Sequence, residues 1–145
     1  TDAIRLAKSD YVTAEGRHKI GRGLGYSSVI MPGERLGMFT GDFMTRVDFN
    51  LRPSCFGVGL DEENVLQCEL YAQHWCIPSH CNDYRGLENR HTGAPGVANC
   101  ALVRGDGDDV WLVAIREMRP GPRGYVEALT DYGEDCDPLT MLNSA

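Results

Sequence analysis

The hydrophobic positions of the chain occur in short runs, and glycine, proline or acidic residues separate most runs from the next. Short apolar, β-branched runs between such turns are typical of β-strands. We therefore predict strands at residues 26–30, 36–40, 56–60, 65–71, 101–104, 110–115 and 125–132. Residues 1–14 fit a strand or a short helix, and residues 72–96 fit a loop with a short helix. The pattern predicts a mostly β domain with short helices, of the α+β class.

Glycine and acidic residues mark the turns between these strands. Residues 61–64 and 105–109 predict two hairpin turns, and residues 21–25, which read G-R-G-L-G, predict a tight glycine turn. The glycine turn is not a dinucleotide-binding fingerprint, because Tyr26 stands where the third glycine would be required. It is either an ordinary turn or a backbone that approaches a ligand closely, since glycine has no Cβ.

Length, charge and apolar content narrow the class of protein. The chain has 145 residues, which suits one domain over residues 1–145, and 42% of them are hydrophobic. No apolar run is long enough for a membrane span. The 14 basic and 21 acidic residues leave a net charge of −7, which disfavours direct nucleic-acid binding and suits a basic protein or peptide partner.

Six cysteines are present, and we expect them to be reduced thiols in an intracellular protein, because no secretory signal is recognised. The first residue is Thr1 rather than Met, which fits a processed or excised fragment. A secreted, disulfide-bonded binding module is the less favoured interpretation.

Several cysteine and histidine side chains between residues 76 and 100 are of the types that bind zinc. They are Cys76, His80, Cys81, His91 and Cys100. Their spacing lacks the paired C-x-x-C framework of structural zinc sites, so we predict that the chain holds no metal.

Four sequence pieces, taken in order, resemble the SET-domain protein lysine methyltransferases. The first is K-I-G-R-G-L-G-Y at residues 19–26, with M-P-G-E-R-L-G-M-F-T-G-D at 31–42. The second is the hairpin L-D-E-E-N-V-L at 60–66, and the third is N-R-H-T at 89–92 with A-N-C at 98–100. The fourth is W-L-V-A-I-R-E-M-R-P-G at 111–121 with E-A-L-T-D-Y-G at 127–133, which is the most specific match.

The resemblance implies a fold of small curved sheets whose C-terminal segment threads under a loop, like a pseudoknot. It implies S-adenosyl-L-methionine as the cofactor and methyl transfer to a lysine ε-amine of a protein, with a histone tail as the expected substrate. Nuclear localisation follows from the same family. The acidic residues Glu134, Asp135 and Asp137 would then form a rim that attracts a basic substrate, or they would only face water.

The resemblance also assigns site residues. Arg22, Gly23 and Leu24 would contact the methionine part of the cofactor through their main chain, and Tyr132 in the D-Y-G motif would be the catalytic tyrosine at the methyl-transfer pore. The N-H-S region, which binds the cofactor in the family, would correspond to Asn89, Arg90 and His91.

The chain departs from the family pattern at several of these positions. Phe39 and Ala101 replace tyrosines that are common in the family, and Arg90 disturbs the N-H-S motif. Ala128 stands in place of the second glutamate before L-T, and the cysteine-rich zinc segment that often follows the domain is missing. These departures support an alternative, a degenerate SET-like domain that binds a peptide or protein with little or no transferase activity.

Overall fold

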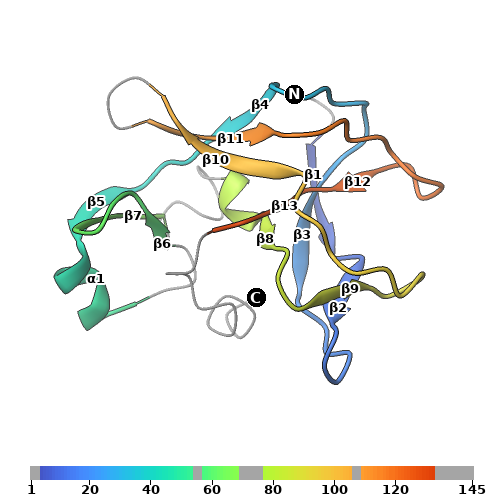
Figure 1. Cartoon of the computed structure of the whole chain (residues 1–145), viewed down its shortest axis with the longest axis horizontal. Coiled ribbons are helices and arrows are strands. Elements are labelled where there is room, and N and C mark those ends of the chain that lie inside the picture. The colour runs from blue at the N-terminus through green and yellow to red at the C-terminus, as the bar shows by residue number, and fades with distance from the viewer. Residues whose placement is uncertain (1–3, 54–56, 69–76, 106–108, 133–145) are drawn as a thin grey trace.

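The computed structural model describes residues 4–53, 57–68, 77–105 and 109–132, and this part of the chain is mostly β, as the sequence predicts (Figure 1). Its helical elements are α1 (Arg46–Leu51) and the 3-10 helix η2 (Ile77–His80). The strands in the first half are β1 (Ile4–Lys8), β2 (Tyr11–Thr13), β3 (Arg22–Tyr26), β4 (Arg35–Met38), β5 (Asp42–Thr45), β6 (Gly57–Gly59) and β7 (Asn64–Gln67). Those in the second half are β8 (Asn82–Asp83), β9 (Leu87–Asn89), β10 (Cys100–Arg104), β11 (Val110–Ala114), β12 (Val126–Glu127) and β13 (Leu129–Thr130).

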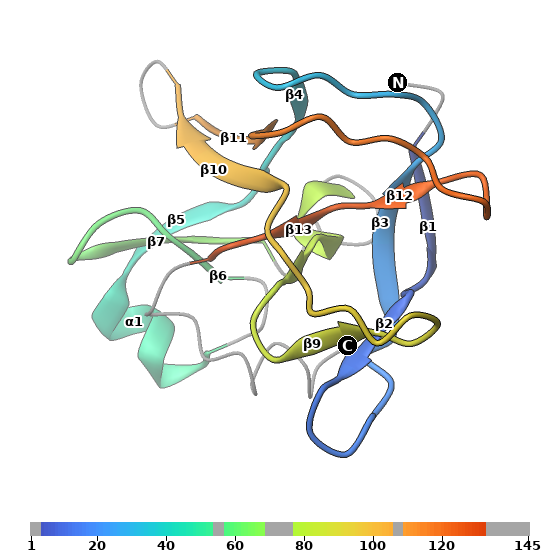
Figure 2. The ribbon, with the colours of Figure 1, turned by 45° about the vertical axis from the view of Figure 1, so that its right-hand side comes forward.

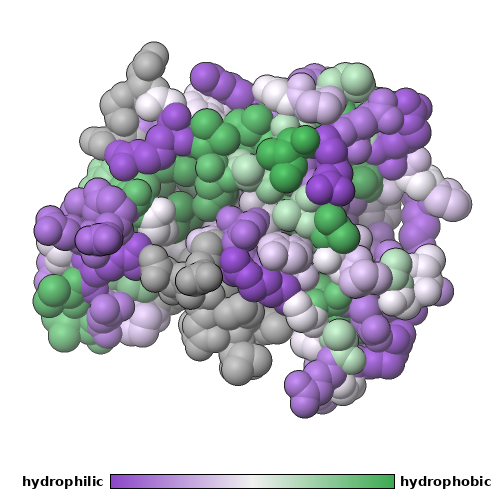
Figure 3. Space-filling model, in the orientation of Figure 1, coloured by the Kyte–Doolittle hydropathy of each residue, from purple (hydrophilic) through white to green (hydrophobic). Residues whose placement is uncertain are grey.

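The strands form several small sheets instead of one large one. The sheets have the strand orders β1-β3-β12, β4-β11-β10-β13-β8, β2-β9 and β5-β7-β6. On the face in Figure 3, apolar side chains gather over the five-stranded sheet, with hydrophilic side chains around them. Neither helix in the described part of the chain has the length and apolar character of a membrane span.

The hairpins predicted from local turn chemistry are confirmed. Strands β10 and β11 pair antiparallel, with Leu102 opposite Leu112, and β6 pairs with β7 across the acidic turn. In that turn the Asp61 carboxylate accepts hydrogen bonds from the backbone N–H of Glu63 and Asn64, both at 2.8 Å. A side chain that closes its own turn in this way makes the hairpin predictable from a few neighbouring residues.

The prediction of a tight turn at residues 21–25 is wrong, because Arg22–Tyr26 form strand β3. Only Gly21 has a turn conformation, with φ of +86°. Strand β3 pairs with β1 on one edge and with β12 on the other, so both partners are distant in sequence. Strand pairing therefore overrides the local turn preference of the glycines, and residues 27–29 after β3 are not a strand.

The region 77–96 contains more strand than the predicted loop with a short helix. The short helix exists as η2, but β8 and β9 follow it. Each pairs with a distant partner, β8 with β13 and β9 with β2, which local periodicity could not indicate.

The C-terminal strand β13 lies between β8 and β10 and runs parallel to both (Figure 2). Strands β8 and β10 therefore flank β13, and the chain between them passes from one side of β13 to the other. The Asn99 side chain fixes β13 in place, since its Nδ2 donates to the Glu127 carbonyl at 3.0 Å and its Oδ1 accepts from the Leu129 N–H at 2.9 Å. The Thr130 hydroxyl adds a buried bond to the Cys100 carbonyl.

Two groups of buried apolar residues stabilise this arrangement. The larger contains Leu24, Tyr26, Leu112 and Tyr132, and the smaller consists of Ile20, Leu87 and Leu129. Strand β13 contributes to the smaller group through Leu129, which has no exposed surface. Burial of this side chain therefore helps to hold the C-terminal strand between its neighbours.

Leu129→Ala is expected to lower the free energy of unfolding by about 2–5 kcal/mol, because it removes buried methyl groups and leaves a cavity. The matched control is Leu51→Ala, since Leu51 is 76% exposed and its truncation should change stability by no more than about 0.5 kcal/mol. Equilibrium urea denaturation measures both. Equal effects of the two substitutions would contradict the placement of β13 in the interior.

Candidate functional site

The glycine-rich strand β3 lies directly beside the carboxylate of Glu127, which belongs to β12. A Cβ atom built on Gly23 would lie 2.4 Å from Glu127 Oε2 and 2.5 Å from Cδ. Real side chains do not approach so closely, so the position requires glycine. The glycine that the family resemblance places beside a cofactor therefore makes room for an internal carboxylate.

The Glu127 carboxylate is buried and collects hydrogen bonds from two other segments of the chain. The Ser9 hydroxyl lies 2.9 and 2.8 Å from its two oxygens, and the Asp10 N–H donates to Oε1 at 2.9 Å. Asn82 Nδ2 lies 3.5 Å from Oε2. Burial raises the pKa of Glu127, and these hydrogen bonds oppose that rise because they stabilise the charged form.

The segment Cys81–Asn82, just after η2, connects the glycine strand to Tyr132. Asn82 Nδ2 donates to the Arg22 carbonyl at 3.0 Å, and the Tyr132 hydroxyl donates to the Cys81 carbonyl at 2.5 Å. The Cys81 thiol also contacts the Ala128 carbonyl at 3.4 Å. Two adjacent residues thus contact both stretches to which the resemblance assigns the cofactor and the catalytic tyrosine.

Tyr132 is held by its main chain as well as by its hydroxyl. Its N–H donates to Asp83 Oδ2 at 3.0 Å. Arg85 Nη1 lies 3.3 Å from the same oxygen, and the Arg85 side chain also forms an ion pair with Asp131. Because Asp83 is buried, its negative charge needs these partners, and together they fix the backbone at Tyr132.

The thiols near this segment are suited to packing and not to nucleophilic attack. Cys81 and Cys100 are free and buried. Burial raises the pKa of Cys100 to about 12, and the pKa of Cys81 also lies well above its usual range because of burial. Both therefore remain neutral thiols at physiological pH. Within the described ranges, no three His, Cys, Asp or Glu side chains are grouped to hold a metal ion, and Cys76 lies outside those ranges.

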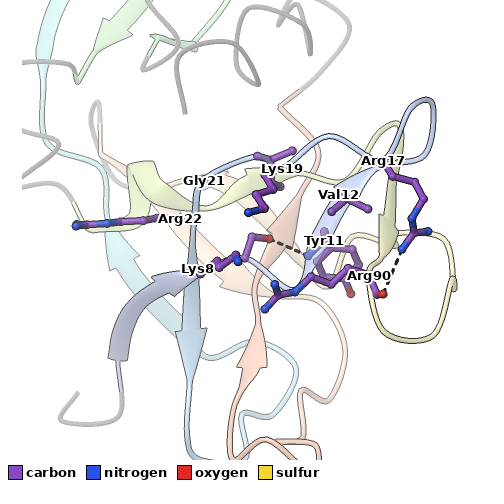
Figure 4. Close-up of a pocket in the computed structure, with 10 residues that line it drawn as sticks. Lys8, Tyr11, Val12, Arg17, Lys19, Gly21, Arg22 and Arg90 are labelled. Carbon is purple, nitrogen blue, oxygen red and sulfur yellow. Dashed lines mark hydrogen bonds between the residues drawn. The ribbon is translucent and has the colours of Figure 1, made fainter.

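The predicted residues Asn89, Arg90 and His91 lie at and just after the end of strand β9, and the Arg90 N–H donates to the Asp10 carbonyl at 2.8 Å. Asn89 Oδ1 accepts from the N–H groups of His91 and Thr92, so it closes a turn. His91 Nε2 lies 3.3 Å from Asp10 Oδ1. Arg90 lines a pocket to which Arg22 also belongs, so the structure brings together two of the predicted cofactor residues (Figure 4).

The remaining predicted positions are buried or lie outside the described ranges. Leu24 and Phe39 are buried in the same core group as Tyr132, so the Phe39 ring, which the resemblance aligns with a tyrosine, packs in the core. The Leu24 carbonyl accepts from the Ala128 N–H at 2.8 Å. Gly133, Glu134, Asp135 and Asp137 lie outside the described residues.

Sequence reasoning missed the contacts of Cys81, Asn82 and Asp83. One signal was available, because Ser79-His80-Cys81 contains the Ser and His types of the N-H-S motif in another order. The decisive fact, that this segment meets both β3 and Tyr132, depends on pairings between residues that are far apart in the chain.

In comparisons with known proteins, no family model and no curated protein sequence matches the chain.

Gly23→Ala is expected to destabilise the fold by about 1–3 kcal/mol, because the new methyl group would overlap the Glu127 carboxylate and force strand β3 or β12 to shift. Gly121→Ala is the control, since a Cβ at Gly121 would meet no atom within 4 Å. Thermal unfolding of both variants measures the difference. A Gly23 variant as stable as the Gly121 variant would contradict the close approach of Glu127.

Glu127→Gln tests the buried carboxylate through its pH dependence. Because the pKa of Glu127 is raised in the folded state, the folded protein holds this proton more tightly than the unfolded chain does. Ionisation therefore costs stability, and the wild type should lose free energy of unfolding relative to Glu127→Gln as the pH rises above about 4.5, the ordinary pKa of a glutamate.

Equilibrium unfolding of the wild type and Glu127→Gln between about pH 4 and 8 measures this trend. The exposed Glu62→Gln serves as the control and should show no such trend. A wild type that gains stability relative to Glu127→Gln with rising pH would show that the hydrogen bonds outweigh burial.

Proposed function

We propose that this protein transfers a methyl group from S-adenosylmethionine to the ε-amine of a lysine in a basic protein, with a histone tail as the expected substrate. One observation carries the proposal: the Cys81–Asn82 segment bonds to both Arg22 and Tyr132. In the SET-domain family, the C-terminal threading brings the tyrosine to the cofactor-binding segments. The position of β13 between β8 and β10 supports the same topology for this chain.

The reaction requires no nucleophile from the protein. When bound, the cofactor would supply the sulfonium methyl group: the neutral lysine nitrogen would attack the methyl carbon in line, and the C–N bond would form as the C–S bond breaks and leaves its electron pair on the thioether sulfur. The protein has to align the two reactants, which can contribute roughly 7–11 kcal/mol to catalysis. It also has to accept a neutral amine, whose ordinary pKa of about 10.4 falls on desolvation.

The hydrogen bonding of Tyr132 suits the second task. Its hydroxyl donates to the Cys81 carbonyl, and a phenolic oxygen is also able to accept a hydrogen bond. An amine N–H that donates to this oxygen would turn its own lone pair elsewhere, toward a methyl donor. The hydroxyl adds no charge of its own, and the neighbouring Cys81 and Cys100 thiols are neutral and cannot compete for the methyl group as thiolates.

The Arg22 side chain at the start of the glycine strand fits the carboxylate of the cofactor. Its guanidinium carries planar donors that suit a carboxylate, and it points away from Lys8, Lys19 and Arg90 (Figure 4). The carbonyls of Arg22 and Leu24 are already engaged by Asn82 and Ala128, so main-chain contacts to the cofactor would use other atoms of this strand. The segment Ser79–Asn82 is a second candidate for the role that the resemblance assigns to Asn89–His91, because Cys81 and Asn82 contact both Tyr132 and Arg22.

Tyr132→Phe is expected to lower the rate of methyl transfer by about 100-fold, because the amine loses the acceptor that orients it. Cofactor binding should be unchanged. The rate is measured by mass spectrometry on a panel of histone and other basic proteins, with thermal shift by S-adenosylmethionine alongside. Tyr26→Phe is the control, since Tyr26 is also buried and its hydroxyl also faces a carbonyl, that of Leu36.

Transfer that survives in Tyr132→Phe, or is lost equally in Tyr26→Phe, would contradict the assigned role. A protein that binds basic peptides but transfers no methyl group would be the degenerate binding module instead. The replacement of a pore tyrosine by Phe39 favours that second function.

A further inference from the structure

Both lysines of the chain, Lys8 and Lys19, line one pocket (Figure 4). Lys8 ends strand β1, and Lys19 stands in the connection between β2 and β3. In Figure 4, Lys19 and Arg90 extend toward Lys8, whereas Arg22 points away from this group. The pocket has a volume of about 390 Å³, and none of the residues that line it is acidic. Three positive charges therefore face one space in a protein whose net charge is −7.

None of these three cations forms an ion pair with a residue that the structure describes. Arg90 Nε is buried and has no hydrogen-bond partner. The like charges of Lys19 and then Arg90 lower the pKa of Lys8, because they repel its protonated form. Nearby acidic side chains are engaged elsewhere, because Glu88 pairs with Arg17 and Glu127 accepts from Ser9 and the Asp10 N–H.

The rest of the pocket wall is apolar. Val12 and Ile20 are buried, and the half-buried Tyr11 adds an aromatic surface. Cations beside an apolar and aromatic wall suit an organic anion better than a bare ion, and the volume is in the range of small-molecule sites. The pocket therefore resembles a site for a molecule with a charged end and a flat or apolar end.

The ligands of the proposed methyl transfer do not balance this charge. S-adenosylmethionine carries a sulfonium, an ammonium and a single carboxylate, so it is itself a net cation. A substrate lysine is also cationic before it loses its proton. At most one of the three positive charges would be neutralised by the cofactor, which leaves a demand for a further anion.

We propose that the pocket formed by Lys8, Lys19 and Arg90 binds a phosphate-bearing small molecule about the size of a nucleotide. The phosphate would lie among the two ammonium groups and the guanidinium, and the remainder of the molecule would lie against Tyr11, Val12 and Ile20. This site does not depend on the proposed methyl transfer, because it rests on charges and a cavity that any function of the chain would have to accommodate.

Isothermal titration of the full chain without S-adenosylmethionine tests the proposal. The probes are ADP, pyrophosphate, inorganic phosphate and adenosine, each at low and at high salt. We expect saturable binding of ADP at one site, weaker binding at high salt because Lys8 and Lys19 are exposed, and no binding of adenosine. Pyrophosphate or phosphate that binds as tightly as ADP would identify an inorganic ligand for the same phosphate site.

The variant Lys8→Glu/Lys19→Glu should weaken ADP binding by about tenfold or more, since charged hydrogen bonds are lost and repulsion replaces them. Arg116→Glu is the charge-matched control, because Arg116 is exposed and does not line the pocket. Lys8→Gln/Lys19→Gln, checked by circular dichroism, separates loss of charge from loss of folding.

Two results would overturn the proposal. One is the absence of binding by every phosphate compound, and the other is equal weakening by Arg116→Glu, which would indicate attraction by the overall charge only. Methyl transfer with normal kinetics but no phosphate binding would reject this site and leave the proposed function intact. Phosphate binding without transfer would support the site and count against the proposed function.

Discussion

The buried carboxylate of Glu127 is the constraint on which the rest of this structure depends. Removing a carboxylate from water costs several kcal/mol, and only well-placed donors can offset that cost. Here the donors come from Ser9, from the Asp10 N–H and from Asn82. The β1–β2 turn, the segment after η2 and strand β12 must therefore meet at one point, and Gly23 must lack a side chain so that the carboxylate can lie there.

This meeting point places the parts of the candidate site. With Asn82 held between Glu127 and the Arg22 carbonyl, the adjacent Cys81 carbonyl is positioned to receive the Tyr132 hydroxyl. The pocket of Lys8, Lys19 and Arg90 lies beside Arg22, at the start of β3. An internal anion and a surface pocket rich in cations are thus separated by little more than Ser9, which lines the pocket and bonds to Glu127. Because the Glu127 carboxylate accepts hydrogen bonds from Ser9 and the Asp10 N–H, the pocket cations remain available to an external anion.

The sequence predicts those features that a few neighbouring residues determine. The acidic turn capped by Asp61 and the β10–β11 hairpin are such features, and the mostly β class follows from many of them. Strand β3 was misread as a turn, because its glycines satisfy local turn rules while its pairing with β1 and β12 is distant in sequence. Arg22 and Tyr132 could be named as candidates from their motifs, but their connection through Cys81 and Asn82 joins residues far apart in the chain and could not be predicted.

The central claim is that the glycine strand β3 and the segment that carries Tyr132, just after β13, serve one methyl donor. Backbone NMR of the full chain during titration with S-adenosylmethionine tests it most directly. The account predicts that the amide signals of Arg22 or Gly23 and of Tyr132 shift together and saturate with the same dissociation constant. Shifts confined to strand β3 or to the Tyr132 segment, or no shifts at saturating cofactor, would contradict it.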